Sequence, residues 1–142
     1  MSRWRREGER GTAILEMALL LPVLLLVVLG TIDFGRAVYV HNALANAARD
    51  GARFASVDPT NTTCIKTLAE RNSSLANLGN SDVTVTRGGS LDLGQPVTVA
   101  VQSTYQPLSS LLAGAIGVNT ITLRASATME IRQIPASSLA CP

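Results

Sequence analysis

R-G-T-A-I-L-E-M-A-L-L-L-P-V-L-L-L-V-V-L-G-T-I-D-F-G-R, residues 10–36, is the stretch that decides how the rest of the chain is organised. The 21 residues between Gly11 and Asp33 include one charged residue, Glu16, and one helix-breaking residue, Pro22. At about 1.5 Å per residue such a helix is about 31 Å long, and the hydrocarbon core of a bilayer is about 30 Å thick. The stretch therefore predicts a transmembrane helix over residues 12–32.

The charges of the chain are unevenly distributed. The formal net charge is +2, with 12 Lys and Arg against 10 Asp and Glu. Residues 1–11 hold four arginines against two glutamates, so the remaining residues sum to zero. Basic residues directly before a transmembrane helix stay on the cytoplasmic side. We therefore expect a cytoplasmic N-terminus and an extracytoplasmic C-terminal part, and the charge gives no reason to expect nucleic-acid binding.

A cleaved secretory signal peptide is the alternative interpretation of residues 1–35. The apolar region of a signal peptide usually has about 7–15 residues, and an A-x-A-like cleavage site follows it. Here the apolar run is longer, no such site follows, and helix-compatible residues continue through Val40. The sequence therefore favours a helix that stays in the membrane.

A glycine and a glutamate stand at the cytoplasmic end of the predicted membrane helix. Gly11 closes the basic leader, and Glu16 is the fifth residue after it. An ionised group costs about 2.5–3.5 kcal/mol at the centre of a membrane helix, so it needs a partner or a route to the interface. Glu16 alone is explained as an interfacial residue close to Arg10. Together, Gly11 and Glu16 resemble the processing site of type IV pilin-like precursors.

Residues 33–56 are predicted to continue the same helix outside the membrane. Small and apolar residues recur there at helical spacing and form one stripe: Ala37, Val40, Leu44, Ala47, Gly51 and Phe54. Asp58 and Pro59 end the pattern. The small side chains allow a close neighbour, which is either the chain's own sheet or the helix of a neighbouring subunit.

Three segments beyond this helix alternate between apolar and polar residues, as half-buried strands do. They lie at 83–86, 96–102 and 121–132. We expect an antiparallel sheet of about three strands, covered on one face by the helix stripe. A short helix is also predicted over 63–76. The apolar residues 108–118 form either a short helix or a loop that touches the membrane or a partner.

These elements define an α+β protein in four parts. They are a leader (1–11), a transmembrane helix (12–32), an extracytoplasmic continuation of that helix (33–56) and a strand-rich ectodomain (57–142). With 142 residues, the chain has room for one modest domain besides the membrane helix.

The two cysteines, Cys64 and Cys141, both fall on the predicted extracytoplasmic side, where the environment is oxidising. Their even number predicts a disulfide that fastens the C-terminal segment to the region after the long helix. Chain entropy gives an upper limit of about 4–5 kcal/mol for the stabilisation from a loop of this length. Free buried thiols and pairing between two chains are the alternatives.

No residue pattern indicates catalysis or cofactor binding. His41 is the single histidine and falls on the polar side of its helix, and one histidine with two distant cysteines does not make a zinc site. The Gly88–Gly89 pair lacks the Lys-Ser/Thr that completes a phosphate loop. We therefore expect no enzymatic activity, no catalytic residue, no metal or other cofactor, and no small-molecule substrate.

Three segments carry a resemblance to a known family. G-T-A-I-L-E-M-A-L-L-L-P at 11–22, D-F-G-R-A at 33–37 and A-L-A-N-A-A-R-D-G-A-R at 43–53 resemble TadE-like proteins, which are pseudopilin-type components of the tight-adherence (Flp) pilus machinery of bacteria. Over residues 57–142 the resemblance is architectural only. It implies cleavage after Gly11 by a membrane prepilin peptidase, with Thr12 as the new N-terminus. It also implies that Glu16 is a recognition and assembly carboxylate, which meets the freed amine of Thr12 on a neighbouring subunit.

The chain departs from the short major Flp pilins, in which Tyr follows the glutamate, because Met17 follows Glu16 and a long ectodomain comes after the helix. The expected function is therefore that of a minor pseudopilin-like component of a tight-adherence (Flp, type IVb) pilus or a type II secretion-related system, with a role in cell adhesion. The expected location is the bacterial cytoplasmic membrane. Expected partners are the prepilin peptidase, other pilins, pilus assembly membrane proteins and the bilayer. The alternative is an uncleaved single-pass anchor that presents a partner- or ligand-binding extracytoplasmic domain.

Overall fold

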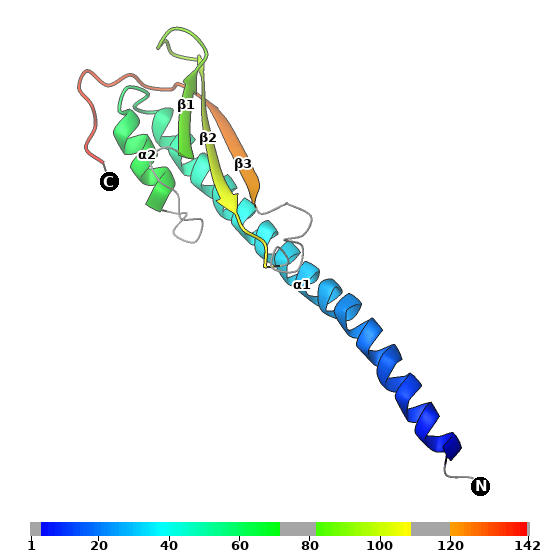
Figure 1. The fold of residues 1–142 in the computed structure, drawn as a ribbon. Helices are drawn as coiled ribbons and strands as arrows, with labels where there is room; N and C mark the ends of the chain where they lie inside the picture. Colours follow the sequence, from blue (N-terminus) through cyan, green and yellow to red (C-terminus); the bar gives the residue numbers. More distant parts are fainter. Residues whose placement is uncertain (1–3, 72–81, 109–119, 142) are drawn as a thin grey trace. The chain divides into compact units, whose positions relative to one another are not determined.

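A computed structural model describes residues 4–71, 82–108 and 120–141 of the chain (Figure 1). Its elements, in chain order, are α1 (Trp4–Ala55), α2 (Thr62–Arg71), β1 (Val83–Arg87), β2 (Pro96–Tyr105) and β3 (Ile121–Glu130). The strands form one antiparallel sheet in the order β1-β2-β3. The predicted α+β class, with a long N-terminal helix and a three-stranded antiparallel sheet, is confirmed.

Helix α1 begins at Trp4, before the predicted start at Thr12, and continues through Pro22 to Ala55. Each residue that joins an existing helix adds one hydrogen bond, so a long helix extends readily into a polar flank that contains no proline. Among the described residues, Gly11–Ala55 contains the one helix that is long and apolar enough to cross a membrane, judged by length and composition. This helix is consistent with a single-pass membrane protein.

The chain divides into two compact units, of which the first comprises residues 1–35 and 107–119 and the second residues 36–106 and 120–142. In the first unit, nearly all side chains from Gly11 to Ile32 are exposed. Asp33 is buried, with an exposed fraction of 7%, and its Oδ1 accepts a hydrogen bond of 2.7 Å from the backbone N–H of Leu108. The chain segment that follows β2 is thus attached to α1 at Asp33.

The second unit has its core between residues 36–55 of α1, helix α2 and one face of the sheet (Figure 1). Alternate residues of β2 point into this core, which explains the alternation seen in the sequence. The fully buried members of the core are Leu44, Ala47, Ala48, Ala52, Ala55, Ile65, Ala69, Val97 and Val99. The stripe predicted on α1 therefore covers the chain's own sheet, which was the first of the two alternatives.

Small residues let α1 lie close to the sheet and to α2. A Cβ added at Gly51 would lie 3.1 Å from Cγ1 of Val99 and 3.5 Å from Cβ of Ala69. Ala48 and Ala52, which fall off the predicted stripe, are also fully buried. The contact face of α1 is therefore wider than the predicted stripe, because two neighbouring elements and not one pack against it.

The three strands begin at the predicted residues, whereas the long helix begins earlier than predicted. The helix predicted over 63–76 is present as α2, and residues 72–76 lie outside the described residues. The same holds for the apolar segment 108–118, of which Leu108 alone is described. The connection between β1 and β2 runs from Gly88 to Gln95 and includes Gly94 at a φ of 83°, where glycine is favoured.

Candidate functional site

The predicted processing residues all lie on the exposed surface of α1. No heavy atom lies within 4 Å of the position that a Cβ would occupy at Gly11, so packing within the chain does not require glycine there. Thr12 and Glu16 are exposed and about one helical turn apart, on the same face of α1. The peptide bond between Gly11 and Thr12 is part of the helix, so a protease has to unwind α1 locally to reach it.

Glu16 stands among exposed apolar side chains. Ile14, Leu15 and Met17 have exposed fractions of 70%, 71% and 64%. The side chains that the structure describes provide no hydrogen-bond or ion-pair partner for Glu16. A carboxylate in apolar surroundings is stabilised by reaching the interface or by a cation from another chain. The carboxylate of Glu16 is therefore accessible on the surface of α1.

Two residues of the D-F-G-R-A motif at 33–37 make contacts that were not predicted from the sequence. Asp33 accepts the hydrogen bond from Leu108 within the first unit. In the second unit, the guanidinium carbon of Arg36 lies 5.4 Å from the ring centre of Tyr105, within the range of a cation–π contact. Arg36 thus contacts the end of β2, and Asp33 contacts the segment that follows it. A motif on one helix gave no signal for these distant partners.

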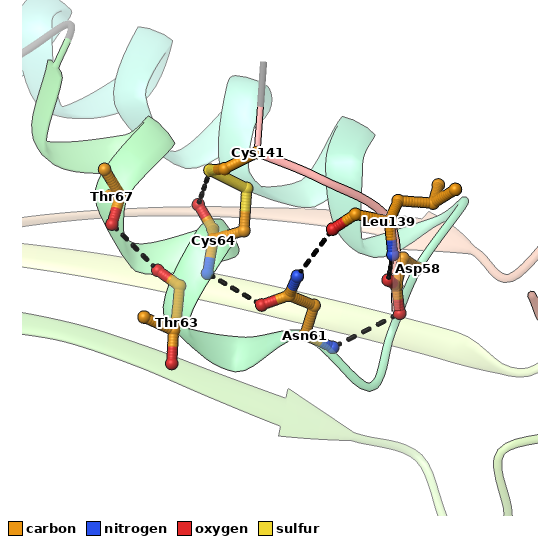
Figure 2. The surroundings of a disulfide bond; sticks show 7 residues. All are labelled: Asp58, Asn61, Thr63, Cys64, Thr67, Leu139 and Cys141. Atoms are coloured by element: carbon orange, nitrogen blue, oxygen red, sulfur yellow. Dashed lines mark hydrogen bonds between the residues drawn. A yellow bond between two sulfur atoms is a disulfide. The ribbon is translucent and has the colours of Figure 1, made fainter. Parts of the chain in front are cut away.

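A disulfide joins the two cysteines (Figure 2). Cys64 in α2 and Cys141 are 77 residues apart in the sequence, and their Cα atoms are 5.5 Å apart. The predicted pairing within one chain is therefore found, and neither of the two alternatives. The bond fastens residues 132–141, which we call the C-terminal strap, to α2.

Two side chains hold the C-terminal strap beside the disulfide (Figure 2). Oδ2 of Asp58 accepts a hydrogen bond of 2.8 Å from the N–H of Leu139, and Nδ2 of Asn61 donates one of 3.0 Å to the carbonyl of Leu139. Oδ1 of Asn61 accepts from the N–H of Cys64 and so caps the start of α2. At its other end, the strap is held by the N–H of Arg132, which donates to the carbonyl of Ser56.

Asp58 is a buried carboxylate between α1 and α2. It is fully inaccessible to solvent, and burial alone raises the pKa of a carboxyl group. Four hydrogen bonds oppose this effect: the hydroxyl of Thr60 and the N–H groups of Leu139, Thr60 and Asn61 all donate to the carboxylate. Together they hold the pKa of Asp58 below its usual value of 3.8. The ionised side chain therefore joins the α1–α2 turn to the strap.

From the sequence, Asp58 was predicted only to end the long helix. The run D-P-T-N at 58–61 carried a further signal, because Asp and Asn before a helix often accept hydrogen bonds from the following N–H groups. Their contacts with Leu139 had no such signal. Within the described parts of the chain, no group of three or more His, Cys, Asp or Glu is placed to hold a metal ion.

The profile of the TadE-like protein family matches residues 11–53. The match begins at Gly11 and includes Glu16, the D-F-G-R-A motif and the part of α1 that covers the sheet. The predicted resemblance is thus found over residues 11–53, which we call the TadE-like segment. No curated protein and no solved structure matches the chain significantly. With one helix that is able to span a membrane, this segment suggests a membrane protein associated with a tight-adherence (Tad) pilus.

Proposed function

We propose that this chain is a minor pseudopilin-like component of a tight-adherence (Flp) pilus assembly or a related secretion system, and that a prepilin peptidase cleaves it between Gly11 and Thr12. One observation carries the proposal, namely the arrangement at the start of the TadE-like segment. Gly11 is exposed and not required by packing, and Glu16 lies on the same helix face as Thr12.

The residues around the proposed cleavage site have distinct physical tasks. Glycine is about 0.8–1 kcal/mol less favourable than alanine in a helix, so Gly11 lowers the cost of unwinding α1 for the peptidase. Cleavage gives Thr12 a free, positively charged amine. In an assembly of parallel helices, the amine of one subunit reaches the Glu16 carboxylate of a neighbour, which neutralises a charge in apolar surroundings.

The proposal also assigns an orientation and partners. The arginine-rich leader supports an N-terminus in the cytoplasm, where the peptidase acts, and a second unit outside the cytoplasmic membrane. The partners are the prepilin peptidase, other pilins or pseudopilins, pilus assembly membrane proteins and the bilayer. In this role the chain is the substrate of an enzyme and has no catalytic activity of its own.

The intact mass of the protein tests cleavage directly. We expect the chain extracted from membranes of its native host to lack residues 1–11 and to begin at Thr12. The same chain should remain full-length in a strain without a prepilin peptidase. Full-length protein in the native host would contradict the proposal.

A pair of glycine substitutions controls for the effect of the leader on export. Gly11→Leu should leave the chain uncleaved, because it places a large side chain at the residue before the cut. Gly8→Ala changes a glycine in the same leader but not at the cut, and should be processed normally. Equal processing of both variants would show that Gly11 is not the recognition residue.

An uncleaved anchor that presents a partner-binding domain is the second candidate. Two observations favour it: the Gly11–Thr12 bond lies inside a continuous helix, and the second unit is a compact module closed by a disulfide. The intact-mass measurement separates the two candidates, because this one requires the leader to be retained.

A further inference from the structure

Strand β3 forms one edge of the sheet. Its ten residues, Ile121–Glu130, pair with β2 on one side only. Among the described residues, no strand pairs with its outer side. The strand has no proline, although proline is a common means of protecting an edge from further pairing. The outer side of β3 therefore presents a row of backbone donors and acceptors.

The register shows which backbone groups face outward. Ile131 exchanges hydrogen bonds with the β2 side, since its N–H donates to the carbonyl of Gln95 and its carbonyl accepts from Gly94. Backbone groups alternate in direction along an antiparallel strand. The even-numbered residues therefore direct their N–H and C=O groups to the free edge. The pairing of Glu130 with Pro96, which has no N–H, agrees with this assignment.

The two faces of β3 carry different side chains at this edge. The odd-numbered residues pack against the core but stay partly exposed: Leu123, Ala125, Ala127 and Met129. The even-numbered residues are exposed and include one basic residue, Arg124, and one acidic residue, Glu130. A strand added at this edge meets an incompletely covered apolar face on one side and two opposite charges on the other.

We propose that the outer edge of β3 binds an extended segment of a different protein, which pairs antiparallel to β3. Charge complementarity requires an acidic residue opposite Arg124 and a basic residue opposite Glu130. The intervening positions that face α1 require apolar residues, because they continue the partly exposed core face. Backbone hydrogen bonds supply the affinity, and these side chains supply the specificity.

A second copy of the chain is a poorer occupant, although its strand has suitable charges. Two antiparallel β3 strands centred on Ala127 would place each Arg124 opposite the partner's Glu130. Strand β3 runs in the same direction as residues 36–55 of α1, since Arg36 contacts the end of β2 that pairs with Ile121, and Ser56 bonds Arg132. Such a pair would put the two Arg36 ends, which follow the candidate membrane segment, at opposite ends of the joined sheet.

A synthetic peptide tests the proposal with the full-length protein in detergent micelles or nanodiscs. The fluorescent peptide Lys-Val-Thr-Ala-Thr-Val-Glu-Val places Lys opposite Glu130 and Glu opposite Arg124 in the antiparallel register. We expect saturable binding by fluorescence anisotropy. A peptide with Lys and Glu exchanged should bind more weakly, and the double variant Arg124→Glu, Glu130→Lys should reverse that preference. No binding, or equal binding of both peptides, would overturn the proposal.

Substitutions at Thr128 provide a matched pair. Thr128→Pro removes an outward N–H, and Thr128→Ala keeps it, while both lose the contact of 2.8 Å with the hydroxyl of Thr98. We expect Thr128→Pro to weaken peptide binding at least about tenfold and Thr128→Ala to change it less than about twofold. Equal affinity of the two variants would overturn the proposal. If Thr128→Pro unfolds, Ser126→Pro and Ser126→Ala make the same comparison.

A cysteine variant of the full-length protein distinguishes a different protein from a second copy of the chain as the occupant of the β3 edge. An Ala127→Cys variant in its native membrane forms a disulfide-linked dimer only if two β3 strands meet at that residue. We expect no such dimer under mild oxidation. Efficient formation of the dimer would assign the edge to a second copy and overturn the proposal.

Discussion

Glu16 is a single carboxylate on an apolar helix surface, and the proposed function gives it a partner in another subunit. Glu16→Leu removes the charge and suits a membrane helix, so the variant should insert as well as the parent chain. It should no longer co-purify with other pilus components, because the cation of the neighbouring subunit loses its partner. Glu16→Asp keeps the charge and should retain part of the association. Normal co-purification of Glu16→Leu would refute this role.

Asp58 is expected to matter for stability and not for assembly. Asp58→Ala removes the acceptor of four hydrogen bonds in a buried place, and we expect a loss of about 2–4 kcal/mol in the free energy of unfolding. Asp58→Asn keeps one oxygen that accepts the hydrogen bonds of the turn, so its loss should be smaller. It still loses the bond from Leu139, because the amide NH2 then faces the N–H of Leu139. Thermal unfolding in detergent micelles measures both. If Asp58→Ala lost less free energy of unfolding than Asp58→Asn, the assigned role of the carboxylate would be contradicted.

The pKa of Asp58 also predicts a pH dependence. The hydrogen bonds lower the pKa of Asp58 in the folded state below 3.8. Its contribution to stability is therefore complete above that value and is lost as the pH falls through the lower, folded-state pKa. The melting temperature of the parent chain should fall at acidic pH more steeply than that of Asp58→Asn. Parallel curves for the two proteins would contradict the linkage.

At the residue scale, the sequence predicted a residue's contacts where its partner is near in the chain or where the residue type is rare. The two cysteines were paired correctly because they are the only two. The contact of Asp33 with Leu108, and those of Asp58 and Asn61 with Leu139, were missed because the partners lie 75–81 residues away, and local spacing contains no information about them. Gly11, Thr12 and Glu16 stay predictions, since their partners belong to other molecules.

At the scale of elements, Gly51 decides how closely α1 approaches the sheet. Replacing glycine with alanine in a helix is favourable by about 0.8–1 kcal/mol, but the new methyl group would lie 3.1 Å from Cγ1 of Val99. We expect Gly51→Ala to be close to neutral and Gly51→Val to lose about 1–3 kcal/mol, because overpacking forces the elements apart.

Gly35 provides the control for this prediction. Nothing lies within 4 Å of a Cβ added there, so Gly35→Ala should gain the helix propensity without crowding. Unfolding curves measured in detergent compare the three variants. If Gly51→Val were as stable as the parent chain, the helix and sheet would not be in the close contact described.

The strands and the long helix were predictable because apolar residues recur in each of them at the spacing of that element. The alternation in β2 and β3 and the stripe on α1 all reflect burial on one side. The width of the buried helix face was underestimated, because Gly51 of α1 lies close to Ala69 of α2 as well as to Val99 of the sheet, and Ala48 and Ala52 beside it are also buried. The start of α1 was placed too late, because the charged residues and glycines of the leader carry no apolar period.

At the scale of the whole molecule, the Cys64–Cys141 disulfide joins the C-terminal strap to the second unit. Cys141→Ser should cost about 2–4 kcal/mol in the free energy of unfolding. Limited proteolysis should then cut within residues 132–141, because the strap keeps only its hydrogen bonds. Cys64→Ser and the double variant should lose the same amount as the single variant, since all three lack the same bond. Additive losses would indicate separate roles for the two thiols.

The same bond encloses all three strands, because β1, β2 and β3 lie between Cys64 and Cys141 in the chain. Together with the disulfide, this part of the polypeptide is a covalent ring. A single backbone cut by a protease at any loop of the ring opens it without releasing a fragment, and both severed ends remain attached to α1. A nicked molecule would therefore keep all its residues, with the mass of one added water, until a reductant is added.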